Sequence, residues 1–93
     1  MQFEWDKSKN EANIQKHGVS FTEARGAFYD RKRIIELDVL HSSGTERRYF
    51  CFGKIGHRIM TVRFTVRHGT IRIFGAGYWR SGRKHYIQAN KGV

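Results

Sequence analysis

Arginines recur along a stretch of alternating apolar and polar residues, RIMTVRFTVRHGTIRIFGAG, at positions 58–77. Successive side chains of a strand point to opposite faces, so the pattern predicts that Arg63, Arg67 and Arg72 share the face opposite the apolar residues. Guanidinium groups bind phosphate through paired hydrogen bonds. The stretch therefore indicates a surface for a phosphate chain, although the solvated face of an ordinary antiparallel sheet would also be polar.

One reaction suits such a surface and needs neither a metal nor a cofactor: cleavage of RNA through its own 2′-hydroxyl group. It requires a base for that hydroxyl, cations for the pentacoordinate phosphate and an acid for the leaving 5′-oxygen. The arginines could supply the cations. Candidates for proton transfer are His41, Glu46, Tyr49 and Lys16.

The segment GYWRSGRKHY, residues 77–86, adds aromatic rings and further cations. Aromatic rings stack on unpaired bases, although Trp79 could equally anchor the core. Arg83 falls in the first turn of an expected helix, where a cation is unfavourable unless an anion lies at the helix start. The candidate RNA-binding residues are Arg63, Tyr78, Trp79, Arg80, Lys16 and Arg83.

The charge of the whole chain favours a polyanionic partner. Its 93 residues include 18 Lys and Arg against 8 Asp and Glu, a formal net charge of +10. Such an excess costs self-repulsion and points to nucleic acid, an anionic membrane or an acidic protein. We expect no membrane span, because no stretch approaches the roughly 18 apolar residues that one needs.

Cysteine and histidine usage argues against a metal centre. Cys51 is the single cysteine, which excludes an intramolecular disulfide and fits a reducing, cytoplasmic compartment. None of the five histidines has the spacing of a zinc ligand, and the glycines match no phosphate-binding loop. We therefore expect no metal and no cofactor.

Capping residues mark two helices in the first third of the chain. Asp6 is placed to cap a helix that runs to about His17, and Gly18 to end it. Ser20 and Glu23 have the spacing of a capping box for a second helix. A short strand at residues 3–5 precedes both helices.

From residue 33 the period of the pattern changes to two. We expect strands at 33–40 and 47–52, a hairpin within 58–77 that turns at His68-Gly69, and a helix from Ser81. The order β-α-α-β-β-β-β-α predicts one α+β domain over residues 1–93: a small antiparallel sheet of about four to five strands, two N-terminal helices on one face, and a C-terminal helix. Alternation places Phe50, Phe52, Ile71, Ile73 and Gly75 on the helix-covered face, and Arg47, Tyr49, Cys51, Arg72 and Phe74 on the other.

Three blocks of the sequence resemble the BrnT family of bacterial type II toxins, over about residues 3–87. The first and most specific is FEWDKSKNEANIQKHGVSFTEA, with Phe28 and Asp30 after it. The second is HSSGTERRYFCFG, where His41, Ser42, Glu46, Arg48 and Gly53 match, and the third is TVRHGTIRIFGAG, where Thr65, Arg67 and Arg72 match.

The resemblance implies the fold of RelE-like toxins and metal-independent RNA cleavage that halts translation. It also implies a BrnA-like antitoxin, a DNA-binding protein of the ribbon-helix-helix type, in a toxin–antitoxin hetero-oligomer. The catalytic residues expected are Arg67, Arg72, His41, Glu46 and Arg48, the last orienting its loop. The chain departs from the family pattern at Gly77, where an arginine is expected; Arg80 could supply that charge from one turn away.

Two other functions remain open at this point. A basic sheet could bind RNA or DNA without cleaving it, and its affinity would then fall with salt. Alternatively, the charge could exist for an acidic protein partner, which is compatible with the toxin hypothesis because an antitoxin must mask the same surface.

Overall fold

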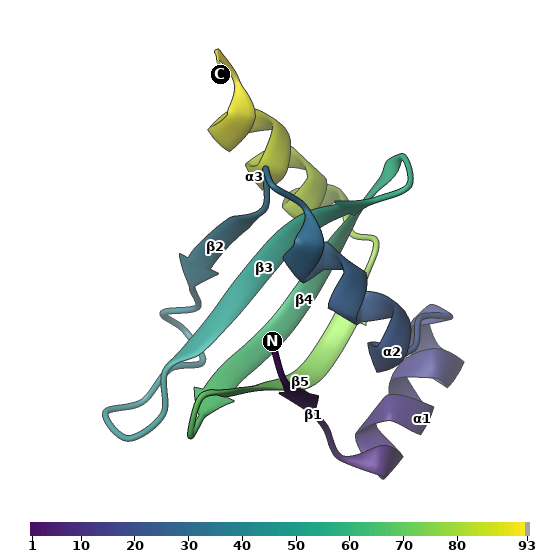
Figure 1. Cartoon of the computed structure of the whole chain (residues 1–93), viewed down its shortest axis with the longest axis vertical. Helices are drawn as coiled ribbons and strands as arrows, with labels where there is room; N and C mark the ends of the chain where they lie inside the picture. The colour runs from purple at the N-terminus through teal and green to yellow at the C-terminus, as the bar shows by residue number, and fades with distance from the viewer. Residues whose placement is uncertain (93) are drawn as a thin grey trace.

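The computed structural model describes residues 1–92 and has an α+β architecture, as predicted (Figure 1). Its five-stranded sheet has the order β1-β5-β4-β3-β2. The antiparallel sheet expected from the sequence is wrong in one respect: β1 pairs in parallel with β5, so the sheet is mixed. The elements are β1 (Phe3–Glu4), α1 (Lys7–His17), α2 (Phe21–Ala24), the 3-10 helix η1 (Arg25–Tyr29), β2 (Ile34–Leu37), β3 (Arg48–Ile55), β4 (Arg58–Arg67), β5 (Thr70–Gly77) and α3 (Arg80–Asn90).

The capping residues act as the sequence predicts. The Asp6 side chain accepts a hydrogen bond from the Lys9 backbone N–H, and Gly18 ends α1 in the left-handed region at φ 70°. Ser20 caps α2 by accepting from the Glu23 backbone N–H. The turn between β4 and β5 consists of His68 and Gly69, both with positive φ, which suits the twist of a two-residue hairpin.

Helices cover both faces of the sheet. In Figure 1, α2 and η1 cross one face, where their side chains pack on alternate residues of β3, β4 and β5. Helix α3 packs on the opposite face through a smaller cluster of Phe52, Ile59 and Tyr86, next to β2 and β3. Core residues of the first face are Phe21, Ala24, Ala27, Phe28, Cys51, Met60, Val62, Phe64, Ile73 and Ala76.

The face assignment of β3 is wrong in the sequence prediction. Cys51 pairs with Val62 and lies in the core under α2 and η1, whereas Phe52 pairs with Thr61 and lies under α3. The run YFCF contains only apolar residues, so alternation could not distinguish its two faces. Arg48, two residues before Phe50, consequently points to the face that carries α3.

A β-bulge in β5 places Gly75 on a different face from the one that the sequence predicts. Arg63 pairs with Gly75 but its neighbour Phe64 pairs with Ile73, so β5 has one extra residue at Phe74. The bulge moves Gly75 to the face of Arg63 rather than the face that α2 and η1 cover. Phe74 lies on this same face, where its ring contacts the guanidinium groups of Arg48 and Arg63.

Helix α1 lies along the edge of the sheet and not on the same face as α2, contrary to the prediction. Its one buried residue is Asn13, whose side-chain amide donates to the Ala76 carbonyl and accepts from the Ala76 N–H. Beyond the last residue paired with β1, the Asn13 amide thus bonds to the outer backbone groups of β5 as a neighbouring strand would. Asn13 also donates to the Val19 carbonyl, which fixes the chain between α1 and α2.

The Asp30 carboxylate joins three segments of the chain. It accepts hydrogen bonds from the Tyr86 hydroxyl of α3 and from the backbone N–H groups of Lys54 and Lys32. Burial raises the pKa of Asp30, but these hydrogen bonds outweigh burial, so the pKa lies below its ordinary value of 3.8. The folded state therefore favours the charged carboxylate, and this contribution to stability is lost as the pH falls through the lowered pKa.

We expect Asp30→Asn to lower the free energy of unfolding at pH 7 by about 1–2 kcal/mol, because charge-assisted hydrogen bonds become neutral ones in a partly solvated site. Urea unfolding at pH 7 and at pH 3 measures the effect, and the gap between the two proteins should narrow at pH 3. Glu11→Gln, on the exposed side of α1, is the control and should change neither value. An equal loss of unfolding free energy at both pH values would contradict a stabilising role for the charged Asp30 carboxylate.

Candidate active site

Three strands bring Arg48 and Arg72 onto one face at the end of the sheet away from α3. Thr65 of β4 is the direct cross-strand partner of both Arg48 in β3 and Arg72 in β5. Direct partners have their Cβ atoms about 5 Å apart, so the two arginines flank one small residue. Thr65 is buried and its hydroxyl donates to the Arg47 carbonyl, which fixes the start of β3 against β4.

Glu46 connects Arg48 to Arg67 at the end of β4. Its Oε1 lies 3.3 Å from Arg48 Nε, and its Oε2 lies 3.4 Å from Arg67 Nη2. Burial raises the pKa of Glu46, but the hydrogen bond from Arg67 and the charge of Arg48 outweigh it, so the pKa is lowered. Glu46 is therefore a carboxylate that aligns two guanidinium groups, which leaves it a weak base.

A second carboxylate borders the cluster on its other side. Glu4, the cross-strand partner of Arg72 in β1, places Oε1 3.8 Å from Arg72 Nη1. Arg63 lies over the ring of Phe74, 5.3 Å from its centroid, and Arg48 lies over the same ring at 4.5 Å. We call Glu4, Glu46, Arg48, Arg63, Arg67, Arg72 and Phe74 the arginine cluster; its four cations exceed its two carboxylates.

The loop between β2 and β3 holds His41 beside the arginine cluster. Asp38 is buried, and its carboxylate lies 2.8 Å from His41 Nδ1, while half of the His41 side chain is exposed. An ionised carboxylate only accepts hydrogen bonds, so Nδ1 donates to Asp38, and in the neutral form of the imidazole the lone pair is on Nε2. This arrangement fits a group that takes up or releases a proton.

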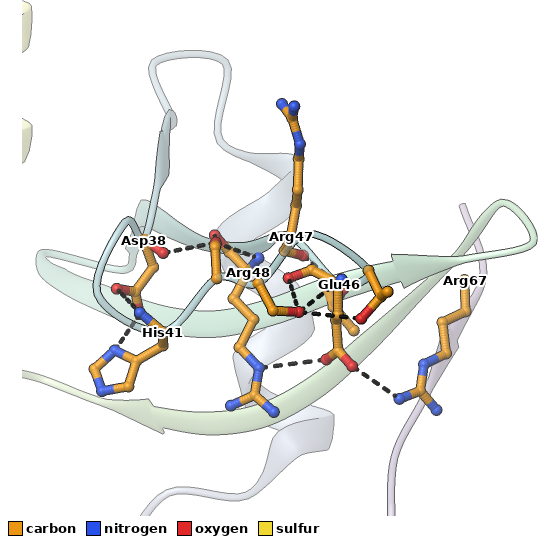
Figure 2. A network of polar contacts seen from close by, with 10 residues as sticks. Asp38, His41, Glu46, Arg47, Arg48 and Arg67 are labelled. Atoms are coloured by element: carbon orange, nitrogen blue, oxygen red, sulfur yellow. Dashed lines mark hydrogen bonds and ion pairs between the residues drawn. The ribbon is translucent and has the colours of Figure 1, made fainter.

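Backbone contacts keep this loop in register with Arg48. The Asp38 N–H donates to the Arg48 carbonyl, and the Arg48 N–H donates to the Ser42 hydroxyl. Ser42 donates in turn to the Asp38 carbonyl. Figure 2 shows the result: the side chains of His41, Arg48, Glu46 and Arg67 extend to one side of the loop, and Arg47 extends to the other.

The remaining candidate residues lie outside the arginine cluster. Lys16 and Trp79 line a groove between α1 and β5, which Arg63 and Phe74 join to the cluster. Tyr78 points toward α2, donates to Glu23 Oε2 and lies under the guanidinium of Arg58. Arg80 and Arg83 line a second hollow at the start of α3, with Arg58 and Tyr78. Trp79 lines both hollows, so it lies between the two groups of predicted RNA-binding residues.

The sequence profile of the ribonuclease toxin BrnT, of type II toxin-antitoxin systems, matches residues 5–82. The chain belongs to the BrnT family. No curated protein matches the sequence. BrnT membership implies that the chain is the toxin of a type II toxin–antitoxin system, that it acts as a ribonuclease on RNA, and that a cognate antitoxin binds it.

Sequence reasoning missed three residues of this BrnT site: Glu4, Asp38 and Phe74. Glu4 lies near Arg72 through the pairing of β1 with β5, for which the sequence carries no signal. Asp38 falls within the strand expected at 33–40, although its separation of three residues from His41 is a signal for a local carboxylate–imidazole pair. Phe74 was placed on the correct face, but its contact with two arginines depends on the bulge, for which the sequence offers no signal beyond the glycine that follows.

Proposed function

We propose that this BrnT chain is a metal-independent endoribonuclease with a RelE-like fold that halts translation by cutting RNA in the cytoplasm. The observation that carries the proposal is the row Arg72–Thr65–Arg48, which is joined through Glu46 to Arg67 and lies beside a histidine held by a buried carboxylate. Cations to hold a phosphate and a group to move a proton are the two requirements of cleavage by the 2′-hydroxyl.

In the proposed reaction, Arg48, Arg67 and Arg72 bind the phosphate oxygens and stabilise the added negative charge of the pentacoordinate state. The 2′-oxygen attacks phosphorus and gives its proton to His41 Nε2. The bond to the 5′-oxygen breaks, that oxygen takes up a proton from solvent water, and the products are a 2′,3′-cyclic phosphate and a 5′-hydroxyl. Asp38 stabilises the imidazolium that forms on His41.

Glu46 acts as a positioning residue in this proposal rather than as the base. Its carboxylate holds two guanidinium groups, and its lowered pKa makes it a poorer proton acceptor than an imidazole. The phosphate of a bound RNA would compete with Glu46 for both arginines. The carboxylate therefore keeps the arginines parallel until substrate arrives.

The same surface suits the antitoxin. A BrnA-like protein of the ribbon-helix-helix type would inhibit the toxin by laying acidic or polar side chains over Arg67 and Arg72, in a hetero-oligomer. About half of the Arg67 side chain is exposed, which leaves it open to such a contact. The excess positive charge would then serve both substrate and inhibitor.

Incubation of the purified chain with end-labelled single-stranded RNA in EDTA tests the proposal. We expect fragments that carry 2′,3′-cyclic phosphate and 5′-hydroxyl ends. Among residues 1–92, no three His, Cys, Asp or Glu side chains gather as metal ligands. Within the same residues, no helix is long and apolar enough to cross a bilayer.

The second candidate, a basic module that binds without cutting, predicts a different result in the same tubes. This module would leave the RNA intact and slow its migration in a gel. Its binding constant would fall with salt concentration, with a log–log slope of roughly −0.7 per phosphate contacted. The exposed guanidinium group of Arg67 and the half-buried ones of Arg63 and Arg72 favour this alternative as strongly as they favour phosphate binding in catalysis.

A further inference from the structure

A groove of about 330 Å³ runs between α1 and β5, beside the arginine cluster. This volume is at the lower end of the roughly 300–1,000 Å³ typical of small-ligand sites. Its lining contains no carboxylate and several cations, in contrast to the arginine cluster with its two acidic residues. The lining residues that matter here are Lys16, His17, Arg63, Phe74, Gly75 and Trp79.

Trp79 reaches this groove because β5 ends in a glycine. A Cβ atom at Gly77 would lie only 2.5 Å from Trp79 Cε2, so the indole lies directly against the backbone where a side chain would otherwise stand. His17 of α1 packs against the indole, with ring centroids 5.1 Å apart and planes nearly perpendicular. At position 77, where the family pattern has an arginine, the glycine thus leaves room for the Trp79 indole.

The groove is continuous with the arginine cluster through Phe74. Arg63 lines the groove and lies over the Phe74 ring, and Arg48 of the cluster lies over the same ring. Gly75 beside them is buried, and the aliphatic part of Arg63 lies against the position where its side chain would stand. A chain whose phosphate lies on Arg48 and Arg72 would thus have an adjoining nucleotide at the groove.

We propose that this groove binds an unpaired base of single-stranded RNA, stacked on Trp79, with the adjoining phosphate on Lys16 and Arg63. The proposal rests on the proposed function, since it supplies a second contact for the same RNA strand. An aromatic face and flanking cations without carboxylates are the combination that binds single strands. Double-stranded RNA keeps its bases stacked and has no free base to offer.

Tryptophan fluorescence tests the proposal without requiring cleavage. In a Trp5→Phe background Trp79 is the single tryptophan, and its emission should be quenched by a 2′-O-methylated single strand, which cannot be cut. An abasic strand of equal length should quench little. We expect Trp79→Leu to bind the methylated strand about tenfold more weakly, the size expected for loss of one stacked base.

Two further variants separate stacking from folding. Gly77→Ala retains the indole but pushes it out of the groove, which should lower the melting temperature while the circular dichroism spectrum stays that of the folded chain. Lys16→Ala removes an exposed cation and should leave both unchanged. Each variant should weaken binding several-fold. Lys84→Ala, an exposed lysine of α3, is the matched control and should bind like the unmodified chain.

The outcomes distinguish this inference from the proposed nuclease. If the chain cuts RNA but Trp79→Leu and Gly77→Ala bind the methylated strand normally and Trp79 emission does not change, the groove proposal is wrong and the nuclease stands. If Trp79 emission is quenched and both variants bind weakly but no RNA is cut, the groove proposal holds and the nuclease fails.

Discussion

An Arg67→Ala, Arg72→Ala double variant should cut RNA at least about 100-fold more slowly than the unmodified chain. Removal of a single donor from a preorganised anion site costs about 100- to 1,000-fold in rate, and this variant removes two, one from β4 and one from β5. The rate of appearance of 2′,3′-cyclic phosphate ends under single-turnover conditions measures it. Induction of the double variant in bacteria should no longer arrest growth and translation.

The matched control is Arg25→Ala, Arg31→Ala, which removes the same two charges from exposed positions of η1 and the turn after it. It should cut RNA and arrest growth like the unmodified chain, because its arginines lie far along the sequence from the cluster and outside its hydrogen bonds. Full toxicity of the Arg67, Arg72 double variant would discard the arginine cluster as the site of cleavage. Equal losses of cleavage rate in both double variants would mean that net charge, and not the arginine cluster, determines the rate.

His41→Gln should slow cleavage by about 100- to 10,000-fold, the range that a positioned acid or base contributes. Glutamine is polar and of similar reach but cannot take up the proton of the 2′-hydroxyl. Asp38→Asn should cause a smaller loss, because the imidazole remains but its orientation and its cationic form are less well supported. RNA binding, measured with a methylated strand, should be unchanged in both variants.

His68→Asn is the control for the loss of an imidazole. His68 lies in the turn between β4 and β5 at φ 51°, a conformation that asparagine tolerates, and it should retain full activity. Cleavage at the normal rate in His41→Gln would assign proton transfer to another group. A flattened dependence of the rate on pH in His41→Gln, with Asp38→Asn intermediate, would separate a proton-transfer role from a structural one.

Local signals in the sequence predicted the elements well, because each signal acts over a few residues. Asp6, Gly18 and Ser20 cap helices through their own side chains or backbone, and His68-Gly69 forces a tight hairpin. The parallel pairing of β1 and the position of α1 were missed because both depend on β5, more than sixty residues away. Such long-range partners leave no periodic trace in either segment.

Prediction of the site followed the same division. Alternation placed Arg63, Arg67, Arg72 and Phe74 on one face, because β4 alternates clearly between apolar and polar residues. Arg48 could not be assigned to that face, because the apolar run after it has no polar member. The contact of Glu46 with two arginines, one of them 21 residues away, emerges only when β3 and β4 are paired.

The amide of Asn13 has a consequence for self-association. The N–H and the carbonyl of Ala76 both bond to that amide, and β1 pairs with β5 at Ile71 and Arg72, so both ends of the outer edge of β5 are already hydrogen-bonded and a foreign strand can add there only with difficulty. The outer side of β2, four residues long, is the longer edge left open. A sheet that can be extended on one side alone closes into a pair and does not polymerise.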